Sequence, residues 1–84
     1  MTQMKIRVQL YAQLRDLAGV SKLDVDIREA GTVAELLEAI YKIVPTLRAH
    51  DKSILVGAGV DFVERDHVLS KDEEIAIMPP VQGG

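Results

Sequence analysis

The chain has 84 residues, a 48% share of hydrophobic side chains and a formal net charge of −3. This length accommodates one small domain with a modest core. Only 4% of the residues are aromatic, so we expect a core of aliphatic side chains. The absence of cysteine excludes a disulfide scaffold, a cysteine-ligated metal site and a thiol nucleophile, and it fits a reducing compartment. The excess of acidic residues argues against nucleic acid as a partner.

The chain shows no targeting or membrane-spanning pattern. Charged and apolar side chains alternate from Met4 to Val8, whereas a signal peptide has an unbroken apolar stretch. The longest uncharged apolar run, residues 54–60, is far shorter than the ~20 residues that cross a bilayer. We therefore expect a soluble cytoplasmic protein with no membrane partner.

The first third of the chain predicts two strands joined by a short helix. Apolar and polar side chains alternate over residues 4–10 and again over residues 23–27, which is the pattern of half-buried strands. Helix-forming residues occupy positions 12–18 between them, and Gly19 is placed to end that helix in a left-handed conformation. The pattern predicts a long hairpin whose connection carries a short helix.

The main helix is predicted to begin after Thr32 and to end before Pro45, because the residue before a proline disfavours helical geometry. Thr32 and Glu35 fit a capping box, in which each side chain accepts a hydrogen bond from the other residue's backbone N–H. Glu38 and Lys42 are spaced for an ion pair on the solvent face. The apolar face recurs at spacings of three and four: Leu36, Leu37, Ile40, Ile43 and Val44.

The second half of the chain predicts three short strands. Residues 54–56 and 60–63 are separated by a turn that uses Gly57 and Gly59 at positive φ. A polar turn over residues 70–74 precedes a last strand over residues 75–78. That strand is apolar at every position, so we expect it in the centre of the sheet with both faces covered. One amphipathic helix and one sheet together predict a two-layer α+β fold.

No pattern within this domain predicts a catalytic or metal site. Residues 57–59 begin like a dinucleotide-binding loop, but Phe62 occupies the third glycine position and no helix follows. His50 and His67 are expected to be surface residues in separate loops, without a ligand partner. Residues 72–74 are acidic but lack the alternating ligands of a calcium loop, so we interpret them as a solvated turn.

The tail after the last strand is the exception, and we divide the chain into a domain of residues 1–78 and an extended tail of residues 79–84. The tail consists of Pro79, Pro80, Val81, Gln82, Gly83 and Gly84. The two prolines favour a stiff, extended exit from the sheet. The two glycines have no side chains, so they can enter a channel too narrow for other residues. The tail therefore predicts delivery of the Gly84 carboxylate into a partner, and a frayed terminus is the alternative interpretation.

This tail resembles the Pro-Pro-Val-x-Gly-Gly ending of the ubiquitin-like β-grasp sulfur carriers, the family of molybdopterin synthase small subunits. Residues 11–15 with Gly19 are similar to the aromatic-Ala-x-x-Arg segment that follows the family's first strand. Residues 66–69 and the acidic turn after them match its late-chain pattern. The resemblance covers essentially the whole chain and implies a mixed β-sheet packed on one main helix.

The resemblance implies a sulfur-transfer cycle in which this chain is a non-catalytic sulfur donor. An E1-like adenylyltransferase uses ATP to adenylate the Gly84 carboxylate, and sulfur then replaces AMP to give a thiocarboxylate. The tail enters the large subunit of molybdopterin synthase and donates sulfur to cyclic pyranopterin monophosphate. The resemblance implies no metal and no permanently bound cofactor.

The resemblance also implies a surface for these partners on the sheet. Tyr11, Phe62 and Met78 occupy the positions of the family's apolar docking patch, with Arg15 beside them. The alternative is that they are ordinary core, sheet or surface residues. Two turns depart from the family: residues 57–59 lack an Asn that many relatives carry, and Asp72 stands where many have Gly, so we expect Asp72 at positive φ.

Other functions stay open at this point. The chain could carry sulfur for thiamine or tungsten-cofactor assembly, although the diproline favours molybdopterin over thiamine. It could be a ubiquitin-like protein modifier that is joined to target lysines through Gly84. It could also be an interaction domain with an inert tail.

Overall fold

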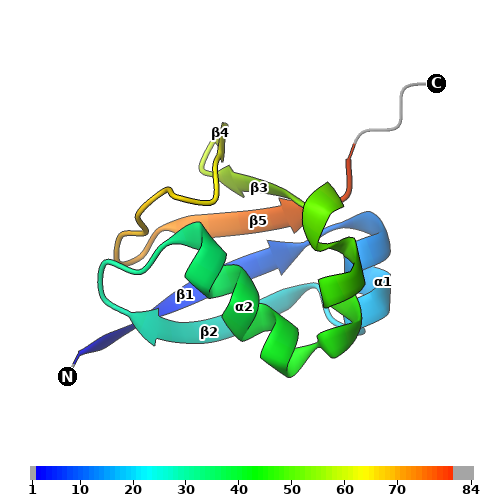
Figure 1. Cartoon of the computed structure of the whole chain (residues 1–84), viewed down its shortest axis with the longest axis horizontal. Coiled ribbons are helices and arrows are strands. Elements are labelled where there is room, and N and C mark those ends of the chain that lie inside the picture. Colours follow the sequence, from blue (N-terminus) through cyan, green and yellow to red (C-terminus); the bar gives the residue numbers. More distant parts are fainter. Residues whose placement is uncertain (1, 81–84) are drawn as a thin grey trace.

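A computed structural model describes residues 2–80, which form a five-stranded mixed sheet with the main helix across one face (Figure 1). The strands are β1 (Gln3–Leu10), β2 (Lys22–Arg28), β3 (Leu55–Ala58), β4 (Asp61–Val63) and β5 (Glu74–Met78). The helices are α1 (Ala12–Ala18), α2 (Val33–Ile43) and the 3-10 helix η1 (Pro45–Ser53). The predicted α+β fold class is confirmed, and the tail residues 81–84 lie outside the described residues.

The sheet has the strand order β2-β1-β5-β3-β4. The predicted hairpin of β1 and β2 is antiparallel, with Ile6 opposite Val25. The last strand, β5, runs parallel to β1 and antiparallel to β3, so the central position predicted for it is confirmed. Parallel strands such as β1 and β5 need a long connection between them, and here that connection includes α2, which crosses the sheet.

The short helix α1 ends where the sequence predicts. Gly19 adopts a φ of 77°, and its N–H donates a hydrogen bond to the Arg15 carbonyl at 2.9 Å. The predicted positive φ is also found at Gly59 (63°) and Asp72 (67°). Gly57 was expected to share it but does not, because β3 continues through Gly57 and the chain turns only at Gly59.

The predicted capping box of α2 is confirmed. Thr32 Oγ1 accepts a hydrogen bond from the Glu35 N–H at 3.4 Å, and Glu35 Oε2 accepts one from the Thr32 N–H at 2.8 Å. One expected core residue is misplaced: Ile43, at the last turn, is 52% exposed. Val33 and Tyr41 are buried on the core face of α2 instead, which shifts that face toward the N-terminus of the helix.

The expected Glu38–Lys42 pair is wrong, because Glu38 is bound by an arginine from η1. Arg48 donates to the two carboxylate oxygens of Glu38 at 2.9 Å and 3.2 Å. A planar guanidinium that contacts both oxygens has better geometry than a single lysine ammonium. The sequence prediction missed this partner because it did not include η1.

The core is aliphatic except for one residue, so the expectation of a purely aliphatic core is corrected at Tyr41. Its ring is 2% exposed, and its hydroxyl donates to Asp51 Oδ1 at 2.6 Å. Burial is the main cause that raises the pKa of Tyr41, and the bond to Asp51 adds to it. The Arg48 guanidinium lies 5.1 Å from the ring centroid. These contacts attach η1 to α2.

Strand β5 is covered on one face only, which corrects the expectation of two covered faces. Ile75 and Ile77 are buried beneath α2, whereas Ala76 and Met78 on the other face are half-buried. Within residues 2–80, no helix is long and apolar enough to cross a membrane.

Replacing Thr32 by Ala is expected to lower the free energy of unfolding by about 1 kcal/mol, because the Glu35 N–H loses its capping acceptor. Urea unfolding followed by circular dichroism measures this change. Thr46→Ala, at an exposed site in η1, is the matched control and should leave the unfolding free energy within about 0.5 kcal/mol of the parent. Equal losses in the two variants would contradict the capping role.

The carboxylate of Glu35 predicts a pH dependence of stability. Hydrogen bonds from Arg28, and then from the Thr32 N–H, hold the pKa of Glu35 below its ordinary value of 4.5. A group whose pKa is depressed on folding stabilises the fold above its unfolded-state pKa, and this contribution disappears as the pH falls through the folded-state value. We expect Glu35→Gln to flatten the acid loss of stability below pH 4.5, measured by urea unfolding at stepped pH. Glu64→Gln, at an exposed side chain, should leave the slope unchanged.

Candidate partner-docking surface

The face of the sheet opposite α2 carries the residues predicted for partner docking. The strand registers place Gln9 beside Ala76, Ala76 beside Gly57, and Gly57 beside Phe62. These four residues therefore form one row across β1, β5, β3 and β4. Since side chains alternate along a strand, Met78 lies on the same face as Ala76.

A hollow of about 270 Å³ opens on this face. Three of the four predicted docking residues, Tyr11, Phe62 and Met78, line it together with small residues. Phe62 is 67% exposed and Tyr11 is 45% exposed, so their rings stand above the sheet instead of packing in the core. Exposed aromatic side chains around a small concave site are typical of a protein-interaction surface.

One backbone and one side-chain hydrogen bond hold Tyr11 in this position. Its N–H donates to the Ile77 carbonyl at 3.2 Å, and its hydroxyl donates to Gln9 Oε1 at 2.6 Å. The next residue, Ala12, has a φ of 52°, in the left-handed region that costs a non-glycine residue energy. Such strain is concentrated at functional sites in proteins, where the surrounding structure enforces it.

Gly57 and Ala76 also line the hollow, although no sequence pattern predicted a site at either residue. A Cβ built on Gly57 would lie 3.7 Å from Met78 Cε and 3.7 Å from the Asp61 carbonyl oxygen, so the missing side chain leaves open volume. The available signal was a glycine inside a strand, which marks a place where another group approaches closely. The expected turn at this glycine is wrong, because Gly57 lies inside β3.

The hollow lies at the start of the tail. Met78, which lines it, is followed directly by Pro79 and Pro80. These prolines line a second, polar hollow of about 210 Å³ together with Gln13, Leu14, His50, Ser53 and Ile54. The other tail residues predicted to enter the partner, Val81, Gln82, Gly83 and Gly84, lie outside the described residues.

Arg15, the fourth docking residue predicted, does not line this hollow. It lies on α1, where its Nε is 3.8 Å from Asp16 Oδ1. Both side chains are more than half exposed, and such surface pairs contribute little to stability.

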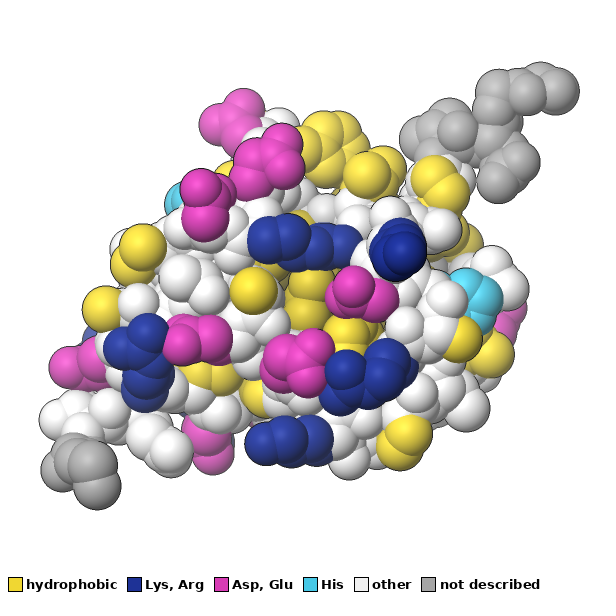
Figure 2. Space-filling view, viewed as in Figure 1, with side chains coloured by type: hydrophobic (Ala, Val, Ile, Leu, Met, Phe, Trp, Pro, Cys, Tyr) yellow, Lys and Arg dark blue, Asp and Glu magenta, His cyan; other side chains and the backbone are white. Residues whose placement is uncertain are grey.

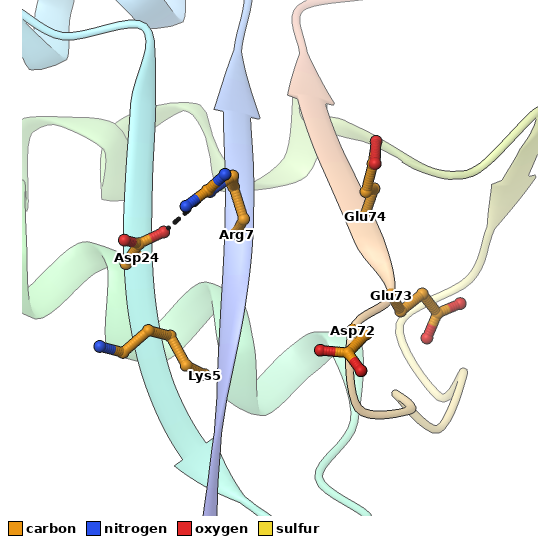
Figure 3. A pocket seen from close by; sticks show the side chains of 6 residues that line it. All are labelled: Lys5, Arg7, Asp24, Asp72, Glu73 and Glu74. Carbon is orange, nitrogen blue, oxygen red and sulfur yellow. Dashed lines mark hydrogen bonds and ion pairs between the residues drawn. The ribbon is translucent and has the colours of Figure 1, made fainter.

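The rest of the outer face is charged (Figure 3). Arg7 on β1 contacts Asp24 on β2 at 3.2 Å, and Lys5 lies one row further along β1. Asp72, in the turn before β5, and Glu74, at the start of β5, line a separate charged hollow together with these three side chains. The outer face is therefore apolar near the tail and ionic at the other end. On the helix-bearing face, basic and acidic side chains are interspersed (Figure 2).

His67 differs from the expectation of an unpartnered surface histidine. Its Nε2 lies 3.0 Å from Glu73 Oε2, and Glu73 Oε1 accepts a hydrogen bond from the Ser70 N–H at 2.9 Å. Burial raises the pKa of Glu73, but the bonds from Ser70 and His67 outweigh it, so the pKa is lowered overall. The His67 carbonyl also accepts from the Val33 N–H at the start of α2. These bonds order the segment that leads into β5.

The described residues offer contacts for a partner on the outer face of the sheet. Within residues 2–80, no three His, Cys, Asp or Glu side chains converge as metal ligands. No buried side-chain polar atom in that range lacks a hydrogen bond. What the arrangement can do is bind another surface through the apolar hollow, beside the tail.

Comparison with known proteins gives concordant results. The family model described as the ThiS family matches residues 8–84. The molybdopterin synthase sulfur carrier subunit of Escherichia coli is 32% identical over 81 residues, which cover 94% of this chain and 99% of that protein. The crystal structure of SAMP1 from Haloferax volcanii, a small archaeal modifier protein, superposes with a TM-score of 0.84 at 26% identity, covering 95% of this chain and 99% of that one.

A third match is a complex of subunits 1 and 2 of the molybdopterin-converting factor from Helicobacter pylori. It has a TM-score of 0.66 at 18% identity and covers 96% of this chain and 100% of the matched one. At this identity the match shows a shared fold. Together with SAMP1, it confirms the expected ubiquitin-like β-grasp architecture.

Proposed function

The chain belongs to the ThiS family, and from that premise we propose that it is a sulfur carrier for molybdopterin synthesis, with sulfur carried on Gly84. The observation that carries the proposal is the family match, which extends through the Gly-Gly ending. The apolar hollow beside Pro79 and Pro80 supports it, because a partner that docks there is next to the root of the tail. The proposed acceptor is cyclic pyranopterin monophosphate, bound in the large subunit of the synthase.

The proposed cycle activates the Gly84 carboxylate in two steps, an adenylyl transfer and then an acyl substitution. In the first, the carboxylate attacks the α-phosphorus of ATP on an E1-like partner, and pyrophosphate leaves. In the second, a sulfur nucleophile supplied as sulfide or its equivalent attacks the acyl carbon, and AMP leaves with the bonding electron pair. The product is a thiocarboxylate, which is a better nucleophile than the original carboxylate. Its use of ATP and of reduced sulfur fits the cytoplasm.

The large subunit is the proposed site of the second half of the cycle. The thiocarboxylate sulfur attacks a carbon of the pterin precursor, and the oxygen substituent on that carbon leaves with the bonding electron pair. Water then attacks the acyl carbon, the sulfur leaves with the precursor, and the Gly84 carboxylate is regenerated. The partner supplies the electrostatic stabilisation of these steps. This division of labour fits a domain whose described residues form a docking surface and whose core is entirely hydrophobic.

Mass spectrometry tests the proposal. The chain is incubated with an active E1-like partner, ATP and a sulfur source. We expect a mass shift corresponding to one oxygen exchanged for sulfur, located on the C-terminal peptide. A chain with Gly84 deleted serves as the control. The proposal is contradicted if the mass of the chain stays unchanged while the same partner activates its own carrier.

A second candidate, a protein modifier, is favoured by the similarity to SAMP1 across nearly the whole chain. In that case the Gly84 acyl group passes to a target lysine amine and forms an isopeptide bond. The discriminating observation is a set of higher-mass adducts that disappear when Gly83 and Gly84 are removed. The sulfur-carrier proposal requires none of these adducts and requires rescue of a strain that lacks its molybdopterin carrier.

A further inference from the structure

Strand β2 is an edge of the sheet with free backbone groups. The Leu10 N–H donates to the Ser21 carbonyl at 2.8 Å, and the Glu29 N–H donates to the Thr2 carbonyl at 3.4 Å. These bonds fix which residues of β2 face β1, because hydrogen-bonded pairs alternate along an antiparallel ladder. Odd-numbered residues of β2 bond to β1, so the N–H and C=O groups of Lys22, Asp24 and Asp26 point away from the sheet. No hydrogen bond within residues 2–80 uses these groups.

A groove of about 470 Å³ runs beside this edge. Asp26, Ile27 and Arg28 line it from β2, and Ala34, Glu38 and Ala39 line it from α2. The groove is open at the two alanines because their side chains are short, and longer side chains at these positions would fill it. Arg28 is held against Glu35 by bonds of 3.0 Å and 2.8 Å. An open strand edge next to a groove is the arrangement that captures an extended peptide.

The strand that already pairs with β2 shows which sequence fits. Opposite Asp24 and Asp26, β1 places Arg7 and Lys5. The Arg7 and Asp24 side chains contact each other at 3.2 Å and lie side by side on the outer face (Figure 3). Between these basic residues, β1 has aliphatic side chains that face the core. The complement of β2 is therefore a strand with alternating basic and aliphatic residues.

A second copy of this chain is disfavoured at this edge. Antiparallel pairing of two β2 strands about Val25 would set Asp24 of one copy opposite Asp26 of the other. Like charges directly opposite each other destabilise a strand pair. The net charge of −3 adds to the repulsion between copies and attracts a basic segment.

We propose that the free edge of β2 binds an extended segment of a partner protein by β-strand addition. The segment carries Lys or Arg opposite Asp24 and Asp26, with aliphatic side chains directed toward the groove against α2. The docking hollow lies over β5, β3 and β4, and β1 separates these strands from β2. The two surfaces can therefore be occupied together. This inference does not depend on the sulfur chemistry proposed above.

The test uses a capped synthetic peptide with the sequence of residues 3–9, Gln-Met-Lys-Ile-Arg-Val-Gln, and the isotopically labelled full chain. Amide exchange is measured by NMR with and without the peptide. We expect the Asp24 and Asp26 amides to exchange quickly in the free chain and to become protected when the peptide binds. The same peptide with Glu in place of Lys and Arg is the control and should give no protection.

Charge-neutral variants test the specificity. Asp24→Asn with Asp26→Asn should weaken binding of the basic peptide roughly tenfold, because two cross-strand ion pairs are lost. Asp16→Asn with Asp66→Asn, at exposed side chains away from both surfaces, has the same net charge and should leave the affinity unchanged. The proposal is overturned if the amides of β2 stay unprotected at saturating peptide, if the Glu peptide binds equally, or if the shifts map to the hollow around Phe62.

Discussion

Deletion of Gly83 and Gly84 is expected to abolish sulfur transfer completely, while the free energy of unfolding stays within about 0.5 kcal/mol of the full chain. The buried hydrophobic residues that form the core lie between Met4 and Ile77, so no residue of the tail belongs to this core. The proposed chemistry takes place only at the terminal carboxylate. Product formation by the reconstituted synthase and urea unfolding of the isolated chain measure the two quantities.

Two controls distinguish loss of the reactive carboxylate from loss of partner binding. The truncated chain should still bind the large subunit through the hollow and should inhibit the full chain by competition. Extension of the chain by one alanine after Gly84 should also abolish transfer, because the reactive carboxylate is moved and the added side chain must enter the same channel. Measurable transfer by the truncated chain would refute the role of Gly84, whatever the binding result.

Local signals predicted the elements of this fold, because a few residues determine each of them. The hydroxyl and carboxylate of Thr32 and Glu35 satisfy the first N–H groups of α2, and only these two residues are needed. Gly19 takes the left-handed conformation that its position at the end of α1 predicts, whereas the same conformation at Asp72 was expected from the glycine that the family carries there. Period-two alternation predicted β1 and β2, and each predicted end lies within one residue of the observed end.

Contacts between distant segments were not predictable in this way. The bond between Glu38 and Arg48 depends on η1, whose nine residues have few apolar side chains and no strong helical periodicity. Tyr41 is buried because Asp51 supplies an acceptor for its hydroxyl, and nothing near Tyr41 in the sequence reveals that partner. His67 and Glu73 meet because the intervening turn folds back, so spacing alone gave no sign of their contact.

The candidate site was predicted only in part, because it too is formed by segments that are distant in the sequence. Tyr11, Phe62 and Met78 come together in one hollow, although they lie far apart in the sequence. Composition and periodicity did not identify them, and their positions came from resemblance to the sulfur carriers. The apolar character of β5 predicts burial on both faces, whereas Ala76 and Met78 are half-exposed on the outer face. A sequence pattern cannot distinguish a residue covered by its own chain from one reserved for a partner.

Substitution of Gly57 is expected to change stability and partner binding in opposite directions. Its φ lies outside the left-handed region, and a Cβ there makes only ordinary contacts at 3.7 Å. Gly57→Ala should therefore raise the free energy of unfolding by about 0.5–1 kcal/mol, because an alanine loses less conformational entropy in a strand. Gly57→Val adds an isopropyl group to the floor of the hollow and should weaken binding of the large subunit roughly tenfold or more.

Phe62 and Val68 provide the matched comparison for this test. Both are exposed hydrophobic residues, at 67% and 55%, but only Phe62 lines the hollow. Phe62→Ala should leave the unfolding free energy nearly unchanged and weaken binding by about 2 kcal/mol, whereas Val68→Ala should change neither. Calorimetric titration with the large subunit gives the affinities. If Gly57→Val and Phe62→Ala bind with the affinity of the parent chain, the partner does not enter this hollow, and the row of small residues across β5 and β3 has no role in docking.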